Sequence, residues 1–327
     1  MPSVSIAQSI EAYLDAVALS RSVNTTRTYR NALAAFTGML ESKQLDLNQI
    51  PARKASENWI ADFAHSLKSY APASESLYLS AVTGWYEYLA AEDLASINLP
   101  RVRMLIRQRG RRPGQRLPQF PRRDIERVLE YAQKLTSLSA KNDRLRLITL
   151  RDRAMLLTLA DTGLRVHEAC NLRRGDVDWH EGRAVIVGKG NQEAVVRFSQ
   201  RSLDSLRDYL STRAVLDGAS GRPLRSLPLF ARHDPGAGKK ILPISTTTAR
   251  AIVHQRVREA LGDEAEASIT PHSFRHYFVT TVLRGSGGNI KLAQELARHR
   301  NIAVTQRYAH LSDDELDRGY YEIFDAK

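Results

Sequence analysis

Apolar side chains recur at helical spacing in the first hundred residues of the chain. Four stretches carry them three and four positions apart, so that each stretch has a single apolar stripe. These stretches are residues 6–17, 29–40, 60–70 and 78–89. Pro51 and Pro72 stand where helices would begin, a position at which the missing amide hydrogen of proline costs nothing. The pattern predicts a bundle of amphipathic helices over residues 1–98.

Helical spacing resumes after residue 119, interrupted by two short β-branched runs. The expected helices cover residues 122–134, 149–161, 164–172, 203–216, 246–261, a stretch beginning at 271, 289–298, 303–310 and 313–324. Residues 149–161 are nearly all apolar, which predicts a central helix. Residues 184–187 and 194–198 predict a hairpin with Lys189 at its tip. The expected fold is mainly α with a small β-hairpin, and residues 119–327 form a second domain with a helical tail.

The net charge of +12 is unevenly distributed. Residues 1–100 carry 7 basic and 10 acidic side chains, whereas residues 101–123 carry nine arginines and no acidic residue. A concentrated basic region favours a polyanionic partner, because each phosphate that is neutralised releases condensed counterions. A basic surface kept only for solubility is the alternative.

Residues 99–118 connect the two expected domains and hold seven of these arginines among prolines and glycines. They are Arg101, Arg103, Arg107, Arg109, Arg111, Arg112 and Arg116. Prolines and glycines disfavour a long helix and like charges repel each other, so we expect a linker. It would act as a hinge that lets the two domains close around a duplex, with its guanidiniums contacting the DNA backbone. A plain disordered connector is the alternative.

The rest of the composition limits the class of protein. No apolar run approaches the roughly 18 residues needed to span a bilayer. The amino terminus lacks the basic and apolar segments of a secretory signal. Cys170 is the single cysteine, so an internal disulfide is excluded. We therefore expect a cytoplasmic protein without a membrane partner.

Polar residues near the carboxyl end suit chemistry on a phosphate. His272 and Arg275 lie one helical turn apart, and His299 and Tyr308 follow. Taken singly, Tyr308 fits a core aromatic equally well, and His299 fits a helix-end cap. Far upstream, Arg165 lies among apolar neighbours three positions before Glu168. Its charge needs a partner, either that carboxylate or an anionic ligand.

Two other kinds of site are disfavoured. His272 and His276 have the spacing of zinc-protease ligands, but Ser273 stands where the H-E-x-x-H motif requires glutamate. Lys189 lies in a glycine-rich turn that fails the G-x-x-x-x-G-K-[ST] pattern of a P-loop. We expect neither a metal nor a bound nucleotide.

These segments resemble, in order and spacing, the sequence boxes of the tyrosine recombinases, the lambda-integrase or phage integrase family that includes Xer-type proteins. The matching segments are 162–168 (first arginine box), 188–190 (lysine hairpin), 272–276 (H-x-x-R box), 296–300 (L-G-H box) and 305–310 (nucleophile segment). Residues 23–94 resemble the family's helical core-binding domain. Arg298 stands where the family usually has glycine, and Ser273-Phe274 replace the more usual Asp-Leu.

The resemblance implies a site-specific recombinase that cleaves and rejoins DNA through a 3′-phosphotyrosine intermediate, without a cofactor. The implied roles are Tyr308 as nucleophile, Arg165, Arg275 and His299 as donors to the phosphate oxygens, His272 as proton acceptor and Lys189 as proton donor to the departing 5′-oxygen. Glu168 and His276 would support these residues.

The resemblance also implies how the protein assembles. Its partner would be double-stranded DNA with inverted-repeat core sites, and a homo-tetramer would form on DNA through the tail 313–324 and pass through a Holliday junction. Two alternatives stay open: a type IB topoisomerase-like nicking and closing enzyme, and a non-catalytic DNA-binding architectural protein.

Overall fold

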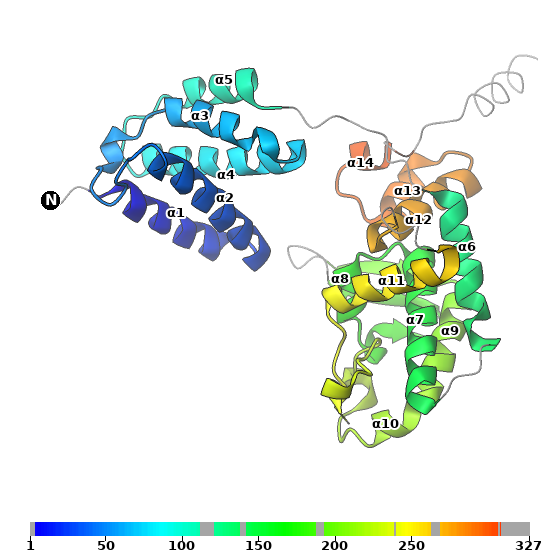
Figure 1. Cartoon of the computed structure of the whole chain (residues 1–327). Coiled ribbons are helices and arrows are strands. Elements are labelled where there is room, and N and C mark those ends of the chain that lie inside the picture. Colours follow the sequence, from blue (N-terminus) through cyan, green and yellow to red (C-terminus); the bar gives the residue numbers. More distant parts are fainter. Residues whose placement is uncertain are drawn as a thin grey trace, which may run out of the picture. The chain divides into compact units, whose positions relative to one another are not determined.

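The chain divides into two compact units, Met1–Gln115 and Arg116–Lys327, which are described separately (Figure 1). The structure is a computed structural model that describes residues 4–111, 121–137, 142–187, 193–238, 240–262, 269–306 and 308. Helices dominate both units, and a small antiparallel sheet lies in the second. The predicted fold class is therefore confirmed.

The first unit is a helical bundle. Its helices are α1 (Ile6–Ser20), α2 (Val23–Glu41), α3 (Asn58–Ser66), α4 (Pro72–Ala91) and α5 (Leu99–Arg109). The ring of Phe36 lies 5.2 Å from that of Phe63 and 5.6 Å from that of Trp85, and all three side chains are buried. The side-chain oxygens of Ser5 and Ser22 cap α1 and α2. The helices predicted from the apolar stripes are thus present.

Helix α5 corrects the expectation that residues 99–118 form an irregular linker. The Asn98 side chain accepts the Arg101 amide at 3.0 Å and so begins the helix, with Pro100 in its first turn. Val102 and Leu105 are buried, and α5 packs against α3 and α4. The apolar residues Val102 and Leu105, three positions apart, therefore favour a helix here despite the run of positive charge. The arginines do not oppose it, because they lie on the solvated faces of the helix.

Several arginines of the expected linker are tied to the bundle, among them Arg103 and Arg111. Arg103 pairs with Glu87 at 2.9 Å. Arg111 donates from Nε to the buried carboxylate of Glu75 at 2.5 Å and from its backbone amide to the same group at 2.8 Å. Lys68 pairs with that carboxylate too, at 2.7 Å. Arg111 thus holds the end of α5 against α4.

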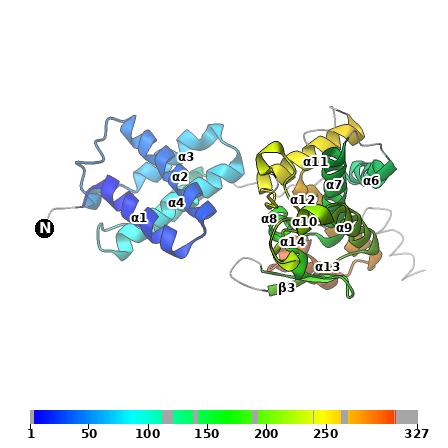
Figure 2. The ribbon, with the colours of Figure 1, turned by 90° about the horizontal axis from the view of Figure 1, so that it is seen from below.

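The second unit is built around α7. Its helices are α6 (Arg122–Lys134), α7 (Asp143–Thr162), α8 (Val166–Asn171), α9 (Gln200–Thr212), α10 (Ala214–Gly218), α11 (Thr246–Leu261), α12 (Pro271–Gly285), α13 (Ile290–Ala297) and α14 (Ile302–Gln306). Helix α7 contacts α6, α8, α9, α11 and α12, and Figure 2 shows this arrangement from below. The side chains of its residues 154–160 are all buried. The expected central helix is confirmed.

The sheet has the order β1-β2-β3, with β1 (Val177–Asp178), β2 (Arg183–Val187) and β3 (Glu193–Arg197) all antiparallel. Strands β2 and β3 pair with Val185 opposite Val195 and cover most of the two runs that predicted a hairpin. The two-residue strand β1 carries no periodic signal and was not predicted. Residues 188–192 lie outside the described part of the chain, so the placement of Lys189 is not described.

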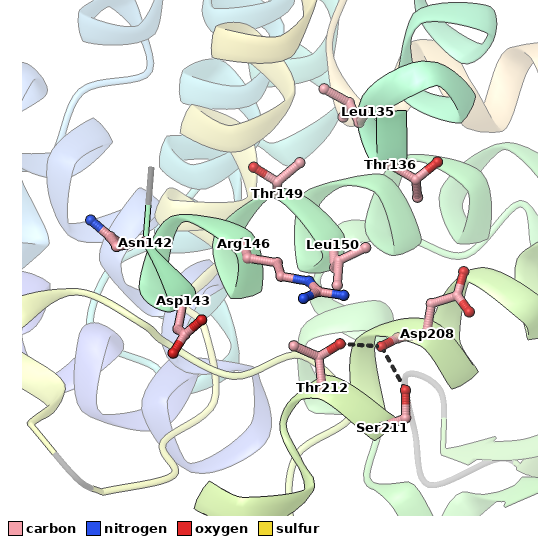
Figure 3. A pocket seen from close by; sticks show the side chains of 10 residues that line it. All are labelled: Leu135, Thr136, Asn142, Asp143, Arg146, Thr149, Leu150, Asp208, Ser211 and Thr212. Atoms are coloured by element: carbon pink, nitrogen blue, oxygen red, sulfur yellow. Dashed lines mark hydrogen bonds between the residues drawn. The ribbon is translucent and has the colours of Figure 1, made fainter. Parts of the chain in front are cut away.

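A hollow of about 590 Å³ opens at the start of α7 (Figure 3). Arg146 lines it from α7, opposite Ser211 and Thr212 of α9, whose hydroxyls donate to the Asp208 carbonyl at 3.0 and 2.9 Å. This hollow is about 20 Å along the helix from the other end of α7. That other end, at Gly163, carries the polar residues expected to act on phosphate.

Candidate active site

Gly163 ends α7 and brings α7 and α12 into close contact. Its φ of 58° is left-handed, a conformation that glycine adopts without cost. A Cβ atom at this position would lie 2.4 Å from Cδ1 of Phe278 on α12, so no side chain fits. Because the two helices lie so close, the Gly163 carbonyl can accept hydrogen bonds from Arg275 and Arg298.

Arg165 and Glu168 form the pair that their spacing predicts. Arg165 precedes the first turn of α8, and the Glu168 carboxylate accepts its backbone amide at 2.8 Å and its Nη1 at 2.9 Å. The Glu168 side chain is 3% exposed, whereas that of Arg165 is 43% exposed. Glu168 therefore holds Arg165 from the protein side and leaves its guanidinium accessible.

Helix α12 positions His272, Arg275 and His276. Thr270 begins the helix by exchanging hydrogen bonds with Ser273, and Pro271 occupies its first turn. Arg275 is 3% exposed, and its guanidinium donates to the carbonyls of Gly163 and Ala297. Burial, together with the neighbouring Arg165 and Arg298, lowers the pKa of Arg275 to about 9, which still leaves it charged at neutral pH.

The Tyr308 ring lies between two histidines. Its centroid is 4.9 Å from the His276 ring and 6.3 Å from the His299 ring, which is nearly parallel to it at 15°. The His272 ring is 4.3 Å from the His276 ring, in an edge-to-face arrangement. The structure thus brings the expected nucleophile and all three expected histidines into one group.

His299 is held in place by the turn that follows α13. Its Nδ1 lies 2.9 Å from the buried hydroxyl of Thr305, which leaves Nε2 for another partner. Its backbone amide donates to the Gln294 carbonyl at 3.0 Å, and the Gln294 side chain donates to the His299 carbonyl at 3.0 Å. Sequence reasoning missed Thr305, although it lies within the segment that resembles the nucleophile box.

All three histidines are neutral at pH 7. Burial lowers the pKa of His272, and the positive charges of Arg275 and Arg165 lower it further. Burial and the neighbouring His272 lower the pKa of His276 to about 4. The pKa of His299 is also about 4, because of burial and the charge of Arg275. Neutral imidazoles can accept a proton or donate a hydrogen bond.

These side chains share a hollow of about 420 Å³. It is lined by Arg165, His272, Arg275, His276, His299, Arg300, Asn301, Val304 and Tyr308. Among the described residues, the lining combines guanidiniums with neutral imidazoles around one phenol and includes no carboxylate. Such a set suits an anion that is to be attacked by the phenol oxygen. Arg300, Asn301 and Val304 were not predicted.

For the other expected site residues the structure gives no position relative to this hollow. Lys189, Arg112 and Arg116 lie outside the described residues. The remaining linker arginines belong to the first unit, where Arg107 and Arg109 are exposed on α5. Arg298, which the sequence marked only by its departure from the family, lies directly behind the hollow. Its Nη2 is 3.2 Å from Glu168 Oε2.

Two further features are absent from the described ranges. The residues that the structure covers contain no group of three or more His, Cys, Asp or Glu side chains that could hold a metal ion. Of the helices described, none is long and apolar enough to cross a membrane.

Comparisons with known sequences agree with the geometry. The profile of the phage integrase family matches residues 122–315, and that of the phage integrase N-terminal SAM-like domain matches residues 10–93. The chain is 31% identical over 300 residues to tyrosine recombinase XerC of Treponema denticola, covering 90% of this chain and 91% of that protein. It is 28% identical over 318 residues to tyrosine recombinase XerC of Staphylococcus aureus, covering 95% of this chain and 94% of that protein.

Solved structures share the fold. The XerH site-specific recombinase bound to palindromic difH substrate superposes with a TM-score of 0.68 at 18% identity, covering 97% of this chain and 84% of that one. A lambda integrase dimer bound to a core site gives a TM-score of 0.63 at 17% identity, covering 94% of this chain and 95% of that one. The catalytic profile spans more than half of the sequence, and the chain therefore belongs to the phage integrase family, the tyrosine-type site-specific DNA recombinases.

Proposed function

We propose that Tyr308 attacks a phosphodiester of double-stranded DNA and forms a 3′-phosphotyrosine intermediate that is later rejoined. One observation carries this proposal: Tyr308 lies in the same hollow as Arg165 and Arg275 and against the rings of His276 and His299. The bond from phosphorus to the 5′-oxygen breaks as the bond to the tyrosine oxygen forms. The phosphodiester energy is therefore conserved for strand exchange.

Arg165 and Arg275 would bind the non-bridging oxygens of the scissile phosphate. Guanidiniums offer planar pairs of donors and stay charged at any working pH. Attack on phosphorus increases the charge on those oxygens, so donors placed in advance stabilise the transition state. His299 would add a third donor from Nε2, because Thr305 occupies its Nδ1.

Protons would move through histidine and lysine. His272 is our candidate for the acceptor of the Tyr308 proton, since its lowered pKa keeps it neutral and able to act as a base. His276 contacts both the His272 ring and the Tyr308 ring and would keep them in place. Lys189 would protonate the departing 5′-oxygen. The pairing of β2 with β3 supports this role, because Lys189 lies between these two strands in the sequence.

The DNA partner would carry inverted-repeat core sites, bound by a homo-tetramer. The net charge of +12 and the nine arginines of residues 101–123 favour a polyanion. The exposed residues Arg107 and Arg109 on α5, and the arginines of the segment after it, would contact phosphates. The carboxyl-terminal tail 313–324, which lies outside the described residues, would dock on a neighbouring protomer, and exchange would pass through a Holliday junction. A chain acting on DNA in this way would work in the cytoplasm.

The direct test uses a nicked duplex that traps the covalent intermediate. The target repeat can be selected from a randomised duplex library by binding to the Tyr308→Phe variant. A labelled duplex nicked near the cleavage position should then yield a protein–DNA adduct on a denaturing gel with the wild-type chain and none with Tyr308→Phe. Tyr277→Phe on α12 is the matched control and should retain the adduct. An adduct that survives Tyr308→Phe would disprove the assignment.

A second assay separates recombination from simple nicking and closing. Two labelled duplexes with the selected site should exchange strands, and the Holliday junction should appear as an intermediate. Relaxation of a supercoiled circle without any exchange would instead favour the topoisomerase-like alternative. Binding without an adduct would favour the architectural one.

A further inference from the structure

Arg298 occupies a backbone position that suits glycine. It ends α13 with φ 58° and ψ 43°, the left-handed conformation, which is strained for a residue with a side chain. Its Nε is also buried without a hydrogen-bond acceptor among the described residues. Glycine would avoid both costs. A long charged side chain retained here needs a compensating role.

The side chain turns inward and joins three segments. It is 11% exposed. Its Nη2 donates to Glu168 Oε2 at 3.2 Å and to the Gly163 carbonyl at 3.3 Å. Its Nη1 donates to the Leu296 carbonyl at 3.2 Å. Arg298 thereby connects the end of α13 to the end of α7 and to α8, elements that Figure 1 shows in the second unit.

Two acceptors of Arg298 are shared with the two arginines in the hollow. Glu168 accepts Arg165, and the Gly163 carbonyl accepts Arg275. Arg298 itself does not line the hollow. Its hydrogen-bonded link to the arginines of the hollow therefore runs through Glu168 and Gly163.

The positive charge of Arg298 gives these shared contacts an electrostatic effect on the hollow. Arg165 and Arg298 are the two guanidiniums that contact the buried carboxylate of Glu168 among the described residues. Without Arg298, the negative charge of Glu168 would be offset by Arg165 alone, and the attraction of Arg165 for a bound anion would be weaker. Arg298 offsets that carboxylate from behind, so the cluster keeps a net positive charge toward the hollow. Opposite charges within about 4 Å interact strongly where water is excluded.

We propose that Arg298 is a positioning residue for phosphate activation, which holds Glu168 and the Gly163 carbonyl so that Arg165 and Arg275 present their charge to the DNA. This inference rests on the proposed function of the hollow. It assigns a role to a side chain at a position where the family usually has none.

The key variant is Arg298→Gly, because glycine accepts the backbone conformation and a folding defect is not expected. At saturating nicked duplex, the rate of adduct formation should fall about tenfold, the effect of losing one hydrogen bond to a charged group. The Kd for the duplex should change by less than about threefold, since such a loss acts on the transition state. Arg298→Lys, which keeps the charge, should recover part of the rate.

A double-variant cycle with Glu168→Gln shows whether Arg298 acts through Glu168. Glu168→Gln removes the charge that Arg298 offsets, so the double variant should be no slower than Arg298→Gly alone. Rate losses that simply multiply would overturn the proposal. So would an Arg298→Gly chain with a wild-type rate, or one whose rate loss is matched by its loss of folded protein. Absence of an adduct with the wild-type chain would instead refute the proposed function itself.

Discussion

Two buried arginine clusters in the second unit differ in their balance of charge. We call them the Asp152 cluster (Arg151, Asp152, Arg256 and Glu259) and the Gly163 cluster (Arg165, Glu168, Arg275 and Arg298). The Asp152 cluster matches its guanidiniums with an equal number of carboxylates. The Gly163 cluster has three guanidiniums and, within the described residues, one carboxylate, which pairs with Arg165 and Arg298.

The Asp152 cluster is closed on itself. Asp152 accepts Arg151 at 2.7 and 2.9 Å through Oδ1, and Arg256 at 2.8 and 3.0 Å through Oδ2. Arg256 reaches Glu259 at 2.6 Å with its remaining Nη1. Burial lowers the pKa of Arg256, but Asp152 and Glu259 raise it more, so the pKa lies above the ordinary value. This cluster has no charge to offer a ligand.

The Gly163 cluster has the opposite character. Arg275 bonds to carbonyl oxygens instead of carboxylates, and burial lowers its pKa to about 9. Burial also lowers the pKa of Arg298, although Glu168 opposes that change. A buried excess of positive charge is unfavourable until an anion arrives. The two clusters therefore differ in unbalanced charge, rather than in buried charge as such, and the unbalanced one is the site that we propose to bind phosphate.

The largest expected effect is on stability, at the balanced cluster. Asp152→Asn would leave Arg151 and Arg256 buried without their carboxylate, which should lower the free energy of unfolding by about 3 to 5 kcal/mol. Urea denaturation of the wild-type chain and the variant would measure this difference in the free energy of unfolding. The rate of adduct formation per folded molecule should stay unchanged. A selective loss of that rate would mean that the Asp152 cluster also serves catalysis.

Arg275→Lys should show the reverse pattern at the unbalanced cluster. A lysine lacks the planar fork of donors, so the single-turnover rate of adduct formation should fall about 10² to 10³-fold. Arg256→Lys is the matched control and should affect stability but leave the rate unchanged. Equal rates for the two variants would remove the distinction between the clusters.

Gly163→Ala tests the close contact that joins the Gly163 cluster. The left-handed φ and the clash with Phe278 should lower the free energy of unfolding by about 1 to 3 kcal/mol. Gly218→Ala, at a glycine with open space around it, is the control and should be neutral or slightly stabilising. Denaturant titration would measure the free energy of unfolding of both variants. Equal stability of the two would show that the close contact is not required.

The smallest expected effect is the pH dependence of the reaction. His272 must be neutral to accept a proton, and its pKa is lowered by burial and by Arg275. The rate at subsaturating DNA should therefore be flat from about pH 8 to 7 and should fall only below the ordinary histidine pKa of 6.5. In His272→Gln this acidic fall should be absent from the slower residual reaction. A fall centred above 6.5 would contradict the assignment.

Sequence patterns predicted most of the fold because local spacing determines it. The stripe of α7 and the β-branched runs of the hairpin each follow from residues close together in the chain. Helix α5 was missed because its arginines and proline were weighed above Val102 and Leu105. These two side chains become informative only when α3 and α4 are present to cover them.

The site was predictable in its parts but not in its assembly. Spacing placed Arg165 beside Glu168, and the resemblance identified Tyr308. Nothing local indicated that Arg298 would reach back to α7 and α8, or that Thr305 would orient His299. Such contacts join segments distant in sequence or depend on a turn, so they emerge only from the folded chain.

We propose that the excess positive charge of the Gly163 cluster stabilises the negative charge of the scissile phosphate. The most direct measurement replaces one non-bridging oxygen of that phosphate by a methyl group, which makes it neutral, and compares wild type with Arg275→Ala. On the ordinary phosphate we predict a rate difference of about 10² to 10³-fold, and on the methylphosphonate one within about tenfold. A difference that stays equally large on the neutral substrate would contradict the claim.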